Sequence, residues 1–279
     1  MPEWSQPSGI FLKEKNLISD HLPNVRGLIL DMDGVLWRDS EPIGNLPAIF
    51  NQIHDCGLRF ILATNNSTKS LAQYQEKLQR FGVKVDSQQI INSAQAVGIF
   101  LQENFPDGAS VYVLGQPSLK ASLESYGMHI VSKAEKKVDI VVASLDFNLT
   151  YEKLSHASLL VQSGSFFIGT NPDVTLPTPE GFIPGSGTVI GALEIASGKK
   201  AKILGKPESG LYEIALRRLQ LSPGETLAIG DRLETDIAGA QKAGIHSALV
   251  LSGASTLEQA QEFHPQPDII TQDLTELVF

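Results

Sequence analysis

The sequence predicts an α/β protein with a Rossmann-like core, a doubly wound parallel sheet into which a smaller α/β domain is inserted. Short apolar runs that are typical of buried strands alternate along the chain with segments of helical apolar spacing. A stretch rich in proline and glycine, residues 170–187, ends a middle segment that has strands and helices of its own. With 279 residues, of which 42% are apolar, the chain can bury a substantial core.

The first predicted strand contains the apolar run 28–30, which is followed at once by Asp31, Asp33 and Gly34. A run this short is typical of a buried parallel strand. Because ligands of open parallel sheets bind at the carboxyl ends of the strands, two acids at this point indicate chemistry or a metal. Aspartate and glycine are also common turn residues, so a plain turn is the alternative for this stretch taken alone.

The second predicted strand, residues 60–63, ends in a run of small polar side chains that includes Thr64 and Asn65. A helix with apolar residues at 46, 49, 50 and 53 precedes this strand, and a helix with Leu71, Tyr74 and Leu78 on one face follows it. Hydroxyl and amide groups beside a helix N-terminus can bind an anion such as phosphate. Plain helix capping is the alternative here.

The middle of the chain predicts a separate α/β module. Beyond a possible strand at 89–92 and a helix at 94–101, we expect strands at 110–114, 139–143 and 166–169 and helices at 119–126 and 151–162. We therefore divide the chain into a lead-in at 1–24, a core at 25–95 and 188–279, and an inserted domain at 96–187. The glycines at 185–191 loosely match a dinucleotide fingerprint, but the strand that should precede them is too short for one.

In the last third, a helix at 189–196 leads to a predicted strand at 201–205, followed by Lys206. A helix at 211–219 and a strand at 226–230 follow, and the segment after that strand begins with Asp231 and ends with Asp236. Reactive groups thus follow four predicted strands. Since a parallel sheet brings its strand ends to one edge, we expect these groups to share a pocket.

Composition excludes several classes of function. The net charge of -9 gives no electrostatic footprint for nucleic acid, and no apolar run is long enough to span a membrane. The first residues lack the features of a secretory signal, so we expect a cytoplasmic protein. The single cysteine, Cys56, is expected to be a small buried residue rather than a nucleophile.

Five segments together resemble haloacid-dehalogenase-superfamily phosphatases of subfamily IIA, which carry a large α/β (C2-type) cap. The segments are 64–67, 170–173, 184–187, 205–207 and 230–237, in addition to the opening Asp-Met-Asp-Gly at 31–34. Members of this group include p-nitrophenyl phosphatases and phosphatases of sugar phosphates, nucleotides, phosphoglycolate and pyridoxal phosphate. The chain departs from the pattern at Ser144, where relatives commonly have glycine nearby, and in its long start before Val25.

The resemblance implies a Mg²⁺-dependent phosphatase that acts on small phosphorylated metabolites through an aspartyl phosphate. Asp31 would be the nucleophile and Asp33 the general acid and base. Asp31 and Asp231 would give carboxylate oxygens to Mg²⁺ and Asp33 its carbonyl, with Asp236 supporting them. Phosphate would be bound by Thr64, Asn65 and Lys206. The inserted domain would be the cap.

Two other readings stay open at this point. A phosphotransferase or phosphomutase would use the same nucleophile and protect the acyl phosphate from water. A non-catalytic metabolite-binding protein of the same fold would be expected to lack at least one of the key acids or Lys206, and none is missing. Asp146, Asn171 and Asp173 are candidate cap or hinge contacts, with a structural role as the alternative for each. The sequence also leaves open whether the chain forms a homodimer.

Overall fold

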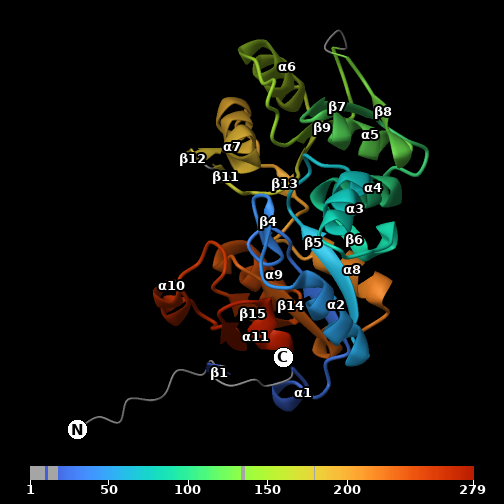
Figure 1. Cartoon of the computed structure of the whole chain (residues 1–279). Coiled ribbons are helices and arrows are strands. Elements are labelled where there is room, and N and C mark those ends of the chain that lie inside the picture. The colour runs from blue at the N-terminus through green and yellow to red at the C-terminus, as the bar shows by residue number, and fades with distance from the viewer. Residues whose placement is uncertain (1–9, 12–17, 133–135, 179) are drawn as a thin grey trace. The chain divides into compact units, whose positions relative to one another are not determined.

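The computed structural model describes residues 10–11, 18–132, 136–178 and 180–279, which form two compact units (Figure 1). The first unit contains the described residues up to Ala63, together with Gln75–Ile90 and Tyr212–Phe279. The second contains Thr64–Tyr74 and Ile91–Leu211, a wider range than the 96–187 predicted for the inserted domain. No helix among the described residues has the length and apolar character needed to cross a membrane.

A seven-stranded sheet is the framework of the first unit, in the order β1-β16-β15-β14-β2-β5-β6. All pairings from β1 to β5 are parallel, as predicted. The chain builds outward from β2 through β5 to β6, and later strands add on the other side through β14. This reversal puts the topological switch point between β2 and β14. The strands are β1 Ile10–Phe11, β2 Gly27–Leu30, β5 Arg59–Thr64, β6 Ile90–Asn92, β14 Thr226–Gly230, β15 His246–Val250 and β16 Ile269–Thr271.

Residue patterns account for these elements. Every residue of β2 and β14 is buried, as expected for central parallel strands. The helix α2, Leu46–Asp55, begins where the Asn45 side chain accepts a hydrogen bond from the Ala48 N–H, and it buries one apolar face. Most of the predicted lead-in lies outside the described residues, but Ile10–Phe11 adds β1 to the sheet edge.

Apart from α8, Gly210–Leu219, which has ten residues like α2 and lies at the division between the units, the other helical segments of the first unit are short. They are α1 Ile18–His21, η1 Ser87–Gln89, η2 Pro223–Glu225, a π-helix at Leu233–Ile237, α9 Ala238–Lys242, α10 Leu257–Glu262 and α11 Leu274–Val278. The helix α3, Leu71–Arg80, spans that division too. A small hairpin of β3, Trp37–Arg38, and β4, Glu41–Pro42, follows the first acids and was not predicted.

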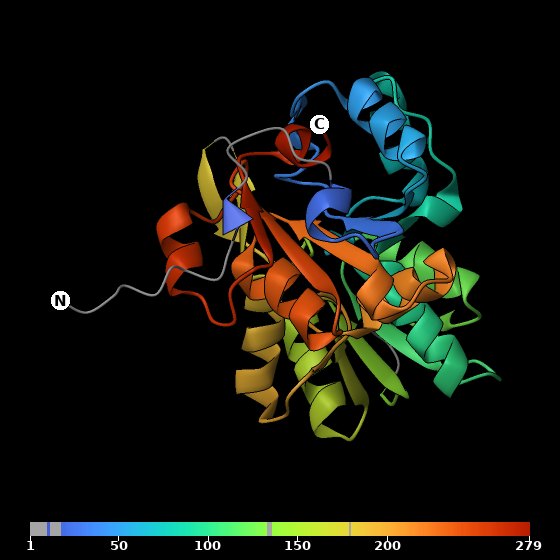
Figure 2. The same cartoon turned by 90° about the horizontal axis from the view of Figure 1, so that it is seen from below.

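A five-stranded parallel sheet forms the middle of the second unit, in the order β13-β10-β9-β7-β8. Its strands are β7 Ser110–Leu114, β8 His129–Ile130, β9 Ile140–Ala143, β10 Phe166–Gly169 and β13 Lys202–Ile203. The helices α4, Ser93–Asn104, and α5, Pro117–Ser125, pack on one face. The helices α6, Tyr151–Gln162, and α7, Ser186–Ser197, pack on the other (Figure 2).

Three sequence predictions need correction. The strand at 201–205 pairs as β13 with β10 of the five-stranded sheet, so it does not belong to the sheet of Asp31. The first residue of β13, Lys202, is exposed, which suits an edge strand. The stretch 170–187 contains a hairpin of β11, Thr175–Thr178, and β12, Gly181–Pro184. Cys56 is exposed rather than buried.

Candidate active site

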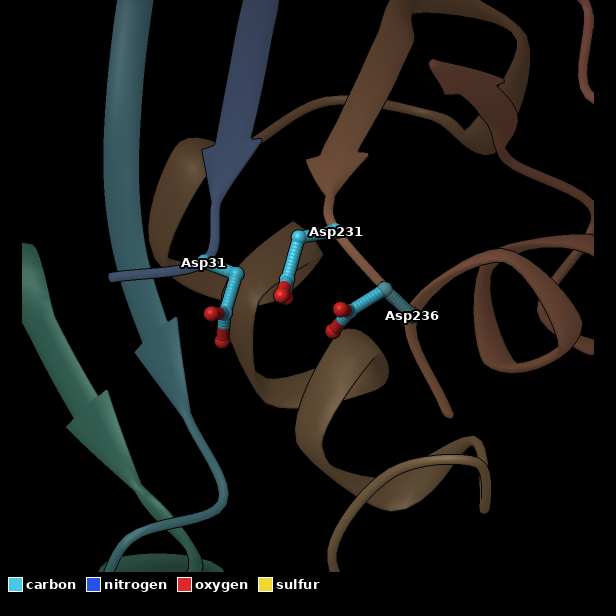
Figure 3. Close-up of side chains that lie close together, drawn as sticks. All are labelled: Asp31, Asp231 and Asp236. Atoms are coloured by element: carbon cyan, nitrogen blue, oxygen red, sulfur yellow. The ribbon is translucent and has the colours of Figure 1, made fainter. Parts of the chain in front are cut away.

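Three aspartates from separate parts of the first unit converge at the switch point of its sheet (Figure 3). One carboxylate oxygen of each lies within 4.8 Å of the others in Asp31, Asp231 and Asp236. All three residues are buried, with exposed fractions of 9%, 4% and 4%. The sequence predicted that these three acids would lie close together, and the structure confirms that they do.

Neighbouring strands fix the positions of Asp31 and Asp231. Asp31 follows β2, and its N–H donates to the Ile229 carbonyl of β14 at 2.8 Å. Asp231 follows β14 directly, and its Oδ2 accepts a hydrogen bond from the Ala254 N–H at 2.7 Å. The Asp231 carbonyl accepts a second bond from the Ser255 N–H at 3.0 Å. Backbone hydrogen bonds therefore fix the main chain at Asp31 and hold the Asp231 carboxylate directly.

Two glycines allow the backbone to pack closely around Asp231. Gly34 has a φ of 87°, and a Cβ added there would collide with the Asp231 carboxylate. A Cβ at Gly253 would collide with the same carboxylate. Larger residues at either position would push Asp231 out of place.

Asp236 is placed by the π-helix Leu233–Ile237, which the sequence did not predict. Asp236 Oδ2 accepts a hydrogen bond from the Arg232 N–H at 3.1 Å. The Asp236 carbonyl accepts one from the Tyr212 hydroxyl at 2.8 Å. Single π-helical turns are frequent at functional sites, because they change the direction in which one side chain points.

The donor set of this cluster suits a divalent cation that prefers oxygen. Three buried carboxylates repel one another, and burial raises the cost of their combined charge. A cation among them would offset that charge, and a set made of oxygen atoms alone matches Mg²⁺ or Ca²⁺ better than softer metals. The residues present therefore fit a divalent metal.

Asp33 lies in a different environment from the three clustered acids. It is exposed, and its Oδ1 accepts a hydrogen bond from the Trp37 indole Nε1–H at 2.7 Å. Sequence reasoning missed this contact. The spacing of four residues could have suggested it only if the hairpin beginning at Trp37 had been predicted.

The predicted phosphate-binding residues all belong to the second unit. Asn65 Oδ1 accepts from the Lys206 N–H at 2.8 Å, and Asn65 Nδ2 donates to the Lys206 carbonyl at 3.0 Å. The loop after β5 and the segment after β13 are thus joined. Thr64 is buried, and its Oγ1 accepts from the Asn66 N–H at 3.1 Å, which leaves the hydroxyl proton able to donate elsewhere. Lys206 is only 2% exposed.

Two of the three candidate cap or hinge residues lie beside Asn65. Asp173 Oδ2 accepts from Asn65 Nδ2 at 3.2 Å, and Asn171 Nδ2 donates to the Asn65 carbonyl at 2.8 Å. Asp146 is elsewhere and pairs with Lys153 at 2.8 Å. Burial, followed by the charges of Asp146 and Glu152, raises the pKa of the nearby Tyr112.

Ser144, the position that departs from the family pattern, is a buried connection within the second unit. Its Oγ lies 2.8 Å from Ser67 Oγ and accepts from Thr170 Oγ1 at 2.8 Å. The ends of β9 and β10 are thereby tied to the loop after β5. A glycine at this position would remove both hydrogen bonds.

Two family models match the chain. A model described as haloacid dehalogenase-like hydrolase matches residues 28–129, and a second, HAD-hydrolase-like model matches residues 203–277. An acid sugar phosphatase of Staphylococcus aureus (strain MRSA252) is 34% identical over 253 residues, which cover 91% of this chain and 96% of that protein.

Two solved structures of similar proteins agree with these matches. A 4-nitrophenylphosphatase from Thermotoga maritima is 31% identical with a TM-score of 0.86, covering 92% of this chain and 97% of that one. A p-nitrophenyl phosphatase from Archaeoglobus fulgidus is 29% identical with a TM-score of 0.86, covering 91% and 98%. The similarity therefore extends over both units.

Proposed function

The chain belongs to the haloacid dehalogenase-like hydrolases and is a phosphoric monoester hydrolase, and on this premise we propose that it dephosphorylates small metabolites, sugar phosphates first among them, through an aspartyl phosphate on Asp31. The observation that carries the proposal is the cluster of Asp31, Asp231 and Asp236 at the sheet's switch point. The names of the relatives support the choice of a sugar phosphate or an aryl phosphate as substrate.

The metal in this proposal is Mg²⁺. Asp31 and Asp231 would hold it through carboxylate oxygens and Asp33 through its carbonyl, with Asp236 supporting them. When bound, Mg²⁺ supplies positive charge that offsets the repulsion between a phosphate dianion and the carboxylates.

The chain's own residues divide the reaction into two steps. In the first, Asp31 attacks phosphorus, a bond forms between its carboxylate oxygen and phosphorus, and the bond from phosphorus to the leaving oxygen breaks. Asp33 gives its proton to that oxygen. In the second, Asp33 takes a proton from water as the water attacks phosphorus, which releases inorganic phosphate and restores Asp31.

Phosphoryl oxygens would be bound by residues at or shortly after the ends of β5 and β13. We assign this role to the Thr64 hydroxyl, the Asn65 backbone N–H and the Lys206 ammonium. The Asn65 side chain is occupied by Lys206 and Asp173, so its function is to hold Lys206 in place. The inserted domain, with Asn171 and Asp173 at its return, would act as the cap that selects the substrate. We further expect the enzyme to act in the cytoplasm, as the sequence predicts.

A phosphate-release screen tests this function. Purified protein is incubated with a panel of sugar phosphates, nucleotides, phosphoglycolate and p-nitrophenyl phosphate, with Mg²⁺ and without an added acceptor. We expect release of inorganic phosphate that excess chelator abolishes and Mg²⁺ restores. Ca²⁺ should inhibit, because its larger and more flexible shell misplaces Asp31 against phosphorus. Full activity in excess chelator would exclude the mechanism.

The same screen separates the alternatives. A phosphotransferase or phosphomutase would release little phosphate until an acceptor was added. A non-catalytic binding protein would release none with any substrate, although substrate could still raise its melting temperature.

A further inference from the structure

The indole of Trp37 reaches the one carboxylate of the opening motif that lies outside the acidic cluster. Trp37 is fully buried, and its Nε1–H donates to Asp33 Oδ1 at 2.7 Å. The loop between them is tightly closed, because the Gly34 N–H donates to the Trp37 carbonyl at 2.8 Å and the Leu36 N–H to the Met32 carbonyl at 2.9 Å. A buried indole N–H needs an acceptor, and Asp33 provides it.

Lys77 packs against the face of the Trp37 ring. Its ammonium lies 4.0 Å from the centroid of the Trp37 ring and is 9% exposed as a residue. The same ammonium donates to the Asp39 carbonyl at 2.7 Å, in the turn between β3 and β4. A cation over the ring draws electron density from the indole, which makes its N–H a stronger hydrogen-bond donor. Phe81 packs against Trp37 with ring centroids 6.0 Å apart.

We propose that Trp37, backed by Lys77, is a positioning residue for Asp33, an inference that rests on the acid–base role assigned to Asp33 under the proposed function. The carboxylate of an exposed aspartate rotates broadly about χ2. The bond to Oδ1 fixes that rotation and leaves Oδ2 as the oxygen that carries the proton to and from the reacting atoms. Asp33 does the chemistry, and Trp37 acts only through it.

Kinetics of Trp37→Phe test this role, since phenylalanine keeps an aromatic ring and removes the donor. For a sugar phosphate, whose alkoxide needs a proton to leave, kcat should fall roughly tenfold to a hundredfold with little change in KM. The burst of nitrophenolate from p-nitrophenyl phosphate should change much less, because that leaving group departs as an anion. Lys77→Met should show the same dependence on leaving group to a smaller extent.

Two controls separate positioning from packing. Phe81→Leu loosens the contact with the Trp37 ring and keeps the indole donor. The ratio of kcat for the sugar phosphate to the burst of nitrophenolate should therefore stay as in the wild type. In an Asp33→Asn background, Trp37→Phe should cause no further loss, because the two residues act as one unit. The proposal would be overturned if Trp37→Phe lowered kcat for the sugar phosphate and the burst of nitrophenolate equally. A full additional loss on adding Trp37→Phe to Asp33→Asn would also overturn it.

An NMR measurement reads the hydrogen bond without any turnover. The chain has two tryptophans, Trp4 and Trp37, so the ¹⁵N-labelled protein gives two indole signals, which Trp4→Phe assigns. Asp33→Asn should move the Trp37 indole proton upfield and leave the Trp4 signal in place. An unmoved Trp37 signal would overturn the proposal while the proposed function stood. If Asp33→Asn itself showed no dependence on leaving group, both would fall.

Discussion

Asp31 and Asp33 have the same side chain, and their different surroundings support the different roles that we propose for them. Asp31 is buried beside Asp231 and Asp236, where a cation can offset the charge and hold one oxygen toward phosphorus. Asp33 is exposed and bound by an indole donor, which leaves its second oxygen able to exchange a proton with substrate or water.

Rapid mixing with p-nitrophenyl phosphate separates these two roles. Asp31→Asn should show neither a burst nor turnover, because an amide is a poor nucleophile and also weakens the metal site. Asp33→Asn should show a burst of nitrophenolate followed by slow turnover, since the leaving group needs no proton but hydrolysis of the intermediate needs a base. A burst in Asp31→Asn would mean that the two roles are reversed.

Gly34 tests how tightly the backbone must pack on Asp231. Gly34→Ala should lower the affinity for Mg²⁺ at least tenfold by isothermal titration, because the added Cβ meets the Asp231 carboxylate. Gly57→Ala is the matched control, since Gly57 also has a positive φ, 69°, but open space around its Cα. Both variants should lose about 1 kcal/mol of stability from backbone strain. Equal Mg²⁺ affinity in the two would contradict the packing argument.

At the scale of elements, the sequence was sufficient to predict the strands at the centre of the larger sheet. The apolar runs at 28–30, 60–63 and 226–230 appear as central strands, and their polar ends carry the proposed site. Prediction failed where a short element depends on its partner. The two-residue strand β13 joins the other sheet, and the strands of the two hairpins are only two to four residues long and are not continuous apolar runs. The hydrogen bond between Trp37 and Asp33 depends on the β3–β4 hairpin, so it was missed when that hairpin was not predicted.

A hydrogen-bonded pair links the starts of two neighbouring strands in the second unit. Asp139 precedes β9 and Ser110 begins β7, and Asp139 Oδ2 accepts from both the Ser110 hydroxyl at 2.7 Å and the Ser110 N–H at 2.8 Å. These bonds, the hydroxyl first, lower the pKa of Asp139 from its ordinary value. Because the folded pKa is depressed, the stabilisation is present above the unfolded pKa and is lost as the pH falls through the folded one.

Chemical denaturation of Ser110→Ala checks this sign. The variant should lose about 0.5–1 kcal/mol of unfolding free energy at pH 7, a modest figure because the pair is exposed. The loss should shrink below about pH 4 as Asp139 becomes protonated. Ser125→Ala removes an exposed hydroxyl that donates to the Ser122 carbonyl and involves no carboxylate, so its effect should not change with pH. A loss that is the same at pH 3 and pH 7 would contradict the linkage.

At the scale of the whole molecule, the chain combines a unit that carries the acids with a second unit that carries Thr64, Asn65 and Lys206. Matches to relatives extend over about nine-tenths of the chain, so both units are family features. The sequence predicted an inserted domain at 96–187 from the proline- and glycine-rich stretch that ends it, and these bounds lie inside those of the second unit. The wider extent of the second unit, which takes in β13 and α7, follows from packing that periodicity does not report.

Exchange of the inserted segment 96–187 for that of a relative tests what this part of the chain contributes. The ranking of sugar phosphates and nucleotides should change, because we propose that this segment is a cap that supplies the contacts to the leaving group. Cleavage of p-nitrophenyl phosphate, which demands few such contacts, should stay within a few-fold of the parent. An unchanged ranking in a folded chimera would show that the rest of the chain selects the substrate.

The most direct test of the account is chemical trapping of the intermediate. Asp33→Asn protein is mixed with substrate and Mg²⁺, quenched in acid and reduced with borohydride, which converts an acyl phosphate to the alcohol, and the peptides are then sequenced by mass spectrometry. The account predicts homoserine at position 31 and unmodified Asp231 and Asp236, with no trapping when Mg²⁺ is omitted. Reduction at any other carboxylate, or burst release of nitrophenolate with no trapped residue, would contradict it.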